Sequence, residues 1–569
     1  MPNPFDDNHR RPTGRHAVAS CGLVIVCAAM GLRVLSARLP LDVPLAPPPV
    51  DRAEQTITLK ELRTALTYLA ADARAGRGVG HEGNDAAVRY LVERMAATGV
   101  TAPASGFAQP VPLVTSRLGR KTRLAVADSA APPRWREWRA GDEFFPVPTS
   151  AVGTVEGDIV YAGAGIVDAD GPLDDYGSLD VRDRIVVVLD QGRPRRPLPV
   201  AIGESRLAED PGFVEVKTRR AAARGAVALV VVSRDRRLHG FTNAWPRDPS
   251  IRDATYRLAE DVSPIPVVRI SASVASELLR LGETDSPARD VNSLFNNPSY
   301  RFTATNRVRL TVDTSSRAVA APNVIGFVPG RDPVLQSEVV VVSAHLDHDG
   351  IDAAGRIYNG ADDDGSGTVA VLEVAGAFAE AVRQGGATRR GVVLALFNAE
   401  ERGLLGSRYF AAHPLPASHR PVANLNLDMV GRHEDIPRTS DPRFRGLRPR
   451  PAAEAKSGFH ILGYTLSPDL ARIVEAEADR VGLSARQEYD DNSSNLLRRS
   501  DHWSFLSAGV PALFLTTGLH PEYHTPLDDV DDIDFENLER MARLTFRAAW
   551  RIADAAGDIR LAAPPTSEP

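Results

Sequence analysis

Five short segments in the second half of the chain bring together histidines and carboxylates, side chains that can bind a metal ion. They contain, in chain order, His345 with Asp347, the run Asp362 to Asp364, Glu400 with Glu401, Asp428, and His524. The two cysteines, Cys21 and Cys27, both lie in an apolar stretch near the N-terminus. A metal site in the rest of the chain must therefore use imidazole and carboxylate ligands.

Two of these segments allow a ligand role and a structural role side by side. His345 and Asp347 are two residues apart, so on an extended strand they face the same side. A metal-bound imidazole usually has its second nitrogen held by a carboxylate; alternatively, Asp347 tunes the site without touching the metal. The three aspartates precede an expected helix, where negative charge is favourable even without a metal.

The remaining segments supply a base and further ligands. Glu400 and Glu401 directly follow an apolar run, and two adjacent glutamates there can divide metal binding and general-base catalysis between them. Asp428 ends another apolar run, and a buried carboxylate needs a partner such as a cation. His524 lies in the polar segment Glu-Tyr-His-Thr-Pro, just before an acidic run.

The candidate ligands balance the charge of two Zn²⁺ ions. They are His345, Asp363, Glu401, Asp428 and His524. Their carboxylates offset three of the four positive charges, a bridging hydroxide offsets the fourth, and the imidazoles add nitrogen. Water between the ions is acidified, so hydroxide forms near neutral pH. Glu400 then accepts its proton and passes it to the leaving amine.

Strands and helices are expected to alternate around these segments. Apolar runs over 338–343, 391–397 and 424–429 predict buried strands, and apolar helical patterns cover 368–379 and 535–555. This alternation predicts an α/β fold with a mostly parallel central sheet flanked by helices. Active sites of such sheets lie at the carboxyl ends of the strands, which is where the polar segments fall.

Two further stretches precede this unit. Helical patterns over 59–70 and 84–99 flank a glycine-rich turn. Short β-rich runs at 158–161, 185–189, 228–232 and 266–270, with one helical piece at 214–223, predict a separate, smaller β-rich domain. We find no catalytic constellation in that region, and its His239 is assigned to the surface.

The bulk composition is ordinary for a globular protein of more than one domain. The chain has 569 residues, too many for one compact core. Hydrophobic residues make up 43% and charged residues 25%, and the net charge is −6. A nucleic-acid partner is not expected, because such proteins usually carry a strongly basic surface.

The N-terminus has the pattern of an export signal. Arg10, Arg11 and Arg15 precede an uncharged apolar run over 17–32, as in a signal peptide. The run is short for a membrane span of about 20 residues. No clean cleavage site follows it, so an uncleaved membrane anchor is the alternative. Either reading predicts an exported protein that is periplasmic, extracellular or anchored facing outside the cytoplasm.

Together the motifs closely resemble the zinc exopeptidase family that includes bacterial leucyl aminopeptidases, aminopeptidase Y and glutamate carboxypeptidase. The shared order is His-x-Asp, Gly-Ala-x-Asp-Asp-Gly-Ser-Gly, Glu-Glu-x-Gly-Leu-x-Gly-Ser, Asp-Met-x-Gly and Tyr-His-Thr. The resemblance implies these roles: His345 and Asp428 on one zinc, Glu401 and His524 on the other, Asp363 bridging, Glu400 as the base, and Asp347 behind the ligands. It also places a cis peptide between Asp363 and Asp364.

Two positions need comment beside the resemblance. The family often has Asn where this chain has Asp362; the extra carboxylate either raises metal affinity or caps the helix. When Gly365, Ser366 and Gly367 are aligned with the Gly-Ser-Gly of the family's motif, Asp363 falls at the position of the bridging residue. His502 lies in a segment that resembles one near the family's substrate site, but the five ligands are already complete without it. Six further histidines are predicted to lie on the surface or to contact the ligands without binding the metal. They are His348, His413, His419, His433, His460 and His520.

The resemblance also sets the expected domains. The unit at 145–290 resembles the protease-associated domain often inserted in this family. The predicted order is a signal peptide or anchor (1–37), a proline-rich linker (38–56), the first part of the peptidase domain (57–144), the insert (145–290), the catalytic zinc peptidase domain (303–556) and a disordered tail (557–569). The peptidase domain is therefore discontinuous.

The leading prediction is a zinc aminopeptidase acting on the N-terminal peptide bond of a peptide or protein substrate. The alternatives are a carboxypeptidase acting on acidic dipeptides, a one-zinc glutaminyl cyclase, and a catalytically inactive receptor-like scaffold. The scaffold predicts missing ligands, whereas here every ligand position is filled and Glu400 is present.

Overall fold

The computed structural model describes residues 48–127, 132–141, 143–167, 174–190, 214–234, 254–282, 288–297, 299–352 and 354–562. The predicted signal or anchor, His239 and the last residues of the tail lie outside them. The end of the predicted linker forms helix α1 (Pro48–Ala53) and a short 3-10 helix η1 (Glu54–Thr56) instead. Val50 and Ala53 are fully buried in the main core, which explains why this segment folds onto the domain.

A mixed eight-stranded sheet carries the candidate site, in the order β1-β13-β17-β14-β18-β21-β19-β20. The four strands β17, β14, β18 and β21 pair in parallel, as predicted. The flanking strands β1, β13 and β19 pair antiparallel with their inner neighbours. The strands are β1 (Ala108–Gln109), β13 (Asn323–Val328), β14 (Glu338–His345), β17 (Gly391–Phe397), β18 (Arg420–Leu427), β19 (Gly458–Leu462), β20 (Ser484–Arg486) and β21 (Ala512–Thr516).

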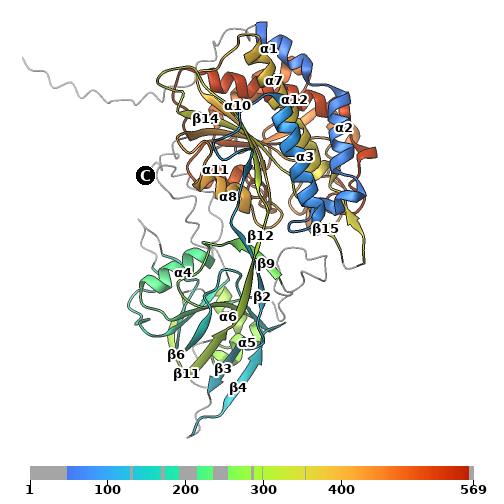
Figure 1. Ribbon diagram of the computed structural model, residues 1–569. Coiled ribbons are helices and arrows are strands. Elements are labelled where there is room, and N and C mark those ends of the chain that lie inside the picture. The colour runs from blue at the N-terminus through green and yellow to red at the C-terminus, as the bar shows by residue number, and fades with distance from the viewer. Residues whose placement is uncertain are drawn as a thin grey trace, which may run out of the picture. The chain divides into compact units, whose positions relative to one another are not determined.

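Alternate residues of the central strands face two different helical layers. Val340 and Val342 of β14 belong to a core shared with α7 and α12, whereas Val339 and Val341 belong to a core shared with α8 and α11. Because both faces are covered, the strand is a continuous valine run rather than an alternation. Figure 1 shows the helices of the first layer, α2 (Leu59–Leu69), α3 (Glu82–Thr98), α7 (Gly367–Arg383), α10 (Pro468–Ala478) and α12 (Phe535–Asp554), and those of the second, α8 (Leu405–Ala412) and α11 (His502–Ser507).

Helix α7 lies at the centre of the first layer and packs against α1, α2, α3 and α12. Among the described residues, the helical stretch Ala361–Arg383 is long and apolar enough to cross a membrane, but 78% of its most apolar window is buried inside the protein. Its apolar character is therefore explained by core packing.

Glu373 on α7 makes stability depend on pH. Burial raises the pKa of its carboxyl to about 7, and the neighbouring Glu61 adds to the effect. Because the folded pKa lies above the ordinary value of 4.5, the stability from this group is complete below pH 4.5 and is lost as the pH rises towards 7. We expect Glu373→Gln to gain unfolding free energy relative to the wild type over that interval, measured by urea unfolding between about pH 5 and 8. Glu93→Gln on the exposed face of α3 is the control, and a gain that does not change with pH would refute this expectation.

A second eight-stranded sheet comes from the region predicted as an insert, in the order β4-β3-β11-β6-β7-β8-β10-β5. The predicted strands at 185–189 and 228–232 and the helix at 214–223 occur at those residues. The sheet extends beyond residues 145–290 of the sequence. Strands β3 and β4 precede this range, β11 follows it, and all three pair into the sheet. Residues 303–312 therefore belong to this sheet and not, as predicted, to the catalytic domain.

The second sheet has buried cores of its own. Its elements are β3 (Arg123–Ala127), β4 (Trp135–Arg139), β5 (Phe144–Pro146), β6 (Gly153–Ala162), β7 (Ile185–Leu189), β8 (Ala228–Val232), β10 (Val267–Ile270), β11 (Arg301–Val312), α4 (Val214–Ala223), α5 (Ala272–Leu278) and α6 (Val291–Asn296). The strands that lead into and out of it, β2 (Leu113–Leu118) and β12 (Thr314–Val319), pair antiparallel, and β9 (Ala254–Leu258) joins them.

Candidate metal centre

Every predicted ligand lies at one edge of the central sheet. His345 is the last residue of β14, the glutamate pair follows β17, and Asp428 follows β18. Asp363 lies in the short helical segment η3 (Ala361–Ser366) directly before α7, and His524 lies in the loop after β21. Parallel strands bring their carboxyl ends to the same edge, which explains how segments far apart in the sequence meet there.

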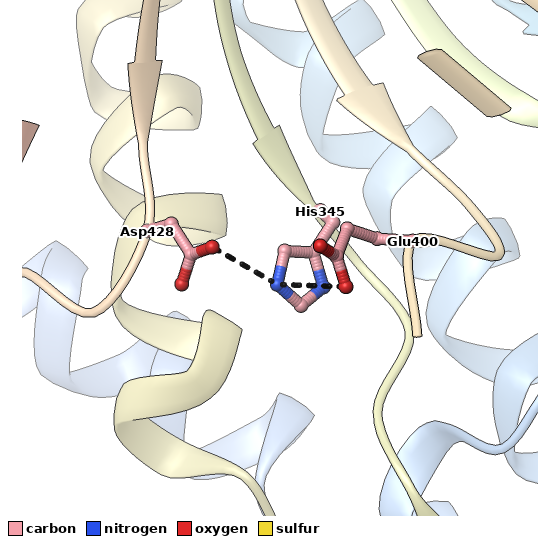
Figure 2. A group of neighbouring side chains, drawn as sticks. All are labelled: His345, Glu400 and Asp428. Atoms are coloured by element: carbon pink, nitrogen blue, oxygen red, sulfur yellow. Dashed lines mark ion pairs between the residues drawn. The ribbon is translucent and has the colours of Figure 1, made fainter. Parts of the chain in front are cut away.

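One group of side chains is centred on His345. Its Nε2 lies 3.7 Å from Asp428 Oδ2 and 3.9 Å from Glu400 Oε2. Figure 2 shows the Asp428 carboxylate on one side of the imidazole ring and the Glu400 carboxylate on the other. All three residues are buried, and each offers one donor atom towards the others, an arrangement that could hold a metal ion.

A second group is centred on His524. Its Nε2 lies 3.2 Å from Asp363 Oδ2 and 3.7 Å from Glu401 Oε2. The other oxygen of Asp363, Oδ1, lies 3.3 Å from His345 Nε2. One carboxylate therefore faces both groups with one oxygen each, so the two groups share Asp363.

The spacing of these donor atoms fits zinc. Zinc bonds of about 2.0–2.1 Å in a tetrahedron place neighbouring donor atoms roughly 3.3 Å apart. The four imidazole–carboxylate separations among the predicted ligands run from 3.2 to 3.7 Å. Buried carboxylates at such spacing would be costly without a compensating charge. The donor set of imidazole and carboxylate also suits zinc, so the residues present fit this metal.

Asp347 contacts the candidate ligands and is not one of them. Its backbone oxygen lies 3.2 Å from His345 Nδ1, and its carboxylate lies 3.8 Å from the same nitrogen. The carboxylate accepts hydrogen bonds from the backbone N–H groups of Glu400 (3.0 Å) and Glu401 (3.3 Å). Asp347 therefore fixes the turn that carries both glutamates as well as supporting the His345 ring.

Two partners of the candidate ligands are missing from the sequence-based prediction. Asp349 Oδ2 lies 2.9 Å from His524 Nδ1, which leaves Nε2 of that ring facing Asp363. The Ser500 hydroxyl donates to Asp428 Oδ2 at 2.6 Å. Neither partner gave a local sequence signal, because the two contacts span 175 and 72 residues.

Of the three consecutive aspartates, only Asp363 faces the ligand groups. Asp364 accepts hydrogen bonds from the backbone N–H groups of His345 (3.0 Å) and Gly367 (2.9 Å), so it ties β14 to the start of α7. Asp362 accepts from the Gly431 N–H at 2.7 Å, and its other oxygen lies 3.3 Å from His520 Nε2. The extra carboxylate at Asp362 is thus matched by a histidine. The cis peptide between Asp363 and Asp364 is present, as the resemblance implies.

A buried arginine supports the loops around the site. Arg77 is 1% exposed, and its guanidinium donates to the carbonyls of Leu346 (2.9 Å), Asn359 (2.6 Å), Gly360 (2.8 Å) and Leu69 (3.2 Å). It therefore joins the N-terminal helical region to the segment after β14 and to the segment just before η3. The sequence patterns did not predict these hydrogen bonds.

The buried carboxyl groups differ in how strongly they hold a proton. Burial raises the pKa of Glu400 well above its usual value; His345 opposes this shift and Glu401 adds to it. Burial acts on Asp363 in the same direction, but hydrogen bonds with His345 and His524 outweigh it and leave the pKa well below the usual range. A carboxylate that stays ionised suits a ligand, whereas one that takes up a proton readily suits a base.

The other histidines take several positions. His502 is fully buried, burial lowers its pKa to about 3, and its ring lies 5.1 Å from Phe514. It belongs to neither ligand group, in keeping with its exclusion from the predicted ligands. The rest are buried beside acidic groups (His348, His460 and His520), partly buried beside Asp534 (His433), or partly to fully exposed (His413 and His419).

The sheet and the cluster at its carboxyl edge place the chain among α/β proteins with a metal centre built from histidines and carboxylates. Residues 323–549 match Peptidase family M28, and this segment contains every candidate ligand. This segment of the chain is therefore similar to a family of zinc exopeptidases, in agreement with the resemblance of its motifs.

Individual relatives agree with this assignment. A probable zinc metalloprotease of Pyricularia oryzae is 28% identical over 297 residues, which cover 46% of this chain and 57% of the relative. Leucine aminopeptidase 1 of Paracoccidioides brasiliensis is 27% identical over 253 residues, covering 43% and 58%. The chain thus spans a little over half the length of these curated relatives. The solved aminopeptidase from Aneurinibacillus sp. strain AM-1 aligns with a TM-score of 0.51 at 18% identity, over 91% of this chain and 99% of that one, which shows a shared fold.

Proposed function

We propose that the chain is an aminopeptidase that binds two Zn²⁺ ions and hydrolyses the N-terminal peptide bond of peptides or proteins. The observation that carries the proposal is the carboxylate of Asp363, whose two oxygens face two separate imidazoles at 3.3 and 3.2 Å. A single ion would need only one of these oxygens. The match to a relative named leucine aminopeptidase 1 supports the choice of the N-terminal bond.

The residues divide into ligands and a base. In this proposal the ligands are His345 and Asp428 for one ion, Glu401 and His524 for the other, and Asp363 for both. Zinc bound there supplies Lewis acidity, which lowers the pKa of a water and polarises the carbonyl of the bond to be cleaved. Glu400 receives the proton of the attacking water and delivers it to the leaving amine. Asp347 holds the backbone of Glu400, so the base keeps its place beside the ligands.

We further propose that the second sheet is a protease-associated domain and that the protein is exported. The first proposal is supported by the resemblance at 145–290 and by a sheet with its own buried cores. The second is supported by the basic residues and apolar run at the N-terminus, which lie outside the described residues. Peptides outside the cytoplasm would then be the substrates.

Metal content and substrate choice, measured together, test the function. We expect the purified protein to hold two zinc ions per chain by elemental analysis and to cleave amino-acid p-nitroanilides. Removal of zinc with a chelator should abolish cleavage, and added zinc should restore it. Two zinc ions with cleavage only of acidic C-terminal dipeptides would replace the aminopeptidase with a carboxypeptidase. One zinc ion with cyclisation of N-terminal glutamine would indicate a glutaminyl cyclase. Absence of zinc would favour a catalytically inactive scaffold.

A further inference from the structure

His348 is a fully buried histidine inside the site that has no part in the mechanism proposed above. Its Nδ1 lies 2.9 Å from Glu401 Oε1. The other oxygen of the same carboxylate, Oε2, lies 3.7 Å from His524 Nε2. The two oxygens of Glu401 are therefore used differently: one faces His348 and the other faces the ligand group of His524.

The His348–Glu401 contact has the length of a hydrogen bond. Two donor atoms on one tetrahedral zinc are expected roughly 3.3 Å apart, whereas a charge-assisted N–H···O bond is about 2.7–2.9 Å long. The contact of 2.9 Å matches the second value. From His348 Nδ1 to the nearest oxygen of Asp363 the distance is 3.9 Å, longer than either. The length of the contact thus favours a polar contact with the carboxylate over an additional ligand.

The ring of His348 is held in place by the backbone around it. A Cβ added to Gly360 would lie 2.4 Å from Cδ2 of the ring and 2.5 Å from Cγ, so the ring packs directly on the glycine. Gly360 has a φ of +58°, which also favours glycine at this position. On another side, the His524 ring lies 5.5 Å away between centroids. These contacts leave the ring little freedom to turn away from Glu401.

The contact completes a pattern among the candidate ligands. His345 is supported by Asp347, His524 by Asp349, and Asp428 by Ser500. Oε1 of Glu401 accepts no hydrogen bond from the described residues, and His348 Nδ1, 2.9 Å away, is placed to be its polar partner. Partners of this kind orient a ligand and typically change metal affinity by about 10–100-fold.

We propose that His348 is a positioning residue for Glu401. Its Nδ1 holds Oε1 through their 2.9 Å contact, as a donor once the two groups align, and so leaves Oε2 alone to bind the metal shared with His524. The neutral imidazole is sufficient for this role, because one ring nitrogen carries a proton in either tautomer. The proposal rests on the proposed function, since it concerns how one of the two zinc ions is held.

Two substitutions of similar size separate the donor from the packing. In His348→Asn the side-chain amide keeps an N–H close to the position of Nδ1, whereas His348→Leu removes the donor. We expect the leucine variant to bind one of its two zinc ions about 10–100-fold more weakly, measured by competition with a chromogenic chelator, and to keep the other unchanged. The asparagine variant should stay close to the wild type. His413→Leu on the exposed end of α8 is the control.

A second variant covers the case in which His348→Leu does not fold, which the melting temperature of the metal-free protein will show. His348→Phe keeps a ring in the same space without the donor and should weaken the same zinc ion. Equal zinc affinities in all the variants would overturn the proposal, because His348 would then be a packing residue only. Complete loss of one zinc ion in both His348→Leu and His348→Asn would also overturn it and make His348 a ligand. Failure of the proposed function is distinguishable, because the wild type itself would then hold fewer than two zinc ions.

Discussion

Glu400→Gln is expected to lower kcat on an amino-acid p-nitroanilide by about 10²–10⁴-fold, the usual contribution of a general acid–base group. Glutamine keeps the shape of the side chain but cannot take up the proton of the attacking water. Bound zinc should be unchanged, because the Glu400 carboxylate lies 3.9 Å from His345 Nε2 and Asp363 comes closer, at 3.3 Å. The measurement is steady-state kinetics beside elemental analysis of the same preparation.

The neighbouring glutamate provides a matched comparison. Glu401→Gln makes the same chemical change one residue along, but Glu401 faces His524 instead of His345. We expect it to release zinc, whereas Glu400→Gln keeps it. If both variants lost zinc equally, Glu400 would be a ligand and the division of work between the two residues would fail. If Glu400→Gln kept wild-type kcat, another group would have to be the base.

Asp363→Asn is expected to have the largest effect on metal binding. Asparagine has a single oxygen that can bind a metal, so it cannot face both His345 and His524 in the way the carboxylate does. We expect zinc content to fall from two ions to one or fewer, with cleavage activity lost. The melting temperature of the zinc-loaded protein should fall towards that of the metal-free protein, because a bound ligand stabilises the folded state in proportion to its affinity.

The adjacent Asp362 is the natural control for this experiment. Asp362→Asn removes the same charge, but this carboxylate contacts the Gly431 N–H and His520 and does not face the two ligand groups. It should keep both zinc ions and most of the activity. Loss of zinc in Asp362→Asn, with retention in Asp363→Asn, would show that the bridging residue has been assigned one position too late.

Much of the fold around the candidate site could be predicted from the sequence, because neighbouring residues define each strand and each motif. The valine run of β14 and the apolar runs of β17 and β18 define buried strands, and each motif follows such a run directly. The order of the motifs then determines which side chains meet, since parallel strands end at one edge. The helix at 214–223 was equally clear, because its pattern lies within ten residues.

The remaining features depend on contacts between distant segments. The limits of the second sheet were missed because β11 pairs with β3 and β6, and no local pattern shows which strands pair. The roles of Arg77, His348 and Ser500 arise from side chains that reach across the fold. A histidine three residues after a strand looks the same in the sequence whether it is exposed or buried against a glutamate, so His348 was assigned to a group that included surface residues.

The hydrogen bonds of Arg77 have a consequence for biosynthesis. The bond from Arg77 to Leu346 spans 269 residues, so at a synthesis rate of about 5–20 residues per second the arginine emerges on the order of tens of seconds before its acceptor. During that interval the whole second sheet, which has cores of its own, is translated. Its folding draws β2 and β12 together, because these strands directly precede and follow it in the chain and pair with each other. That pairing shortens the loop that α2 and α3 must close when they reach the late strands, and so reduces the entropy lost in assembling the peptidase domain.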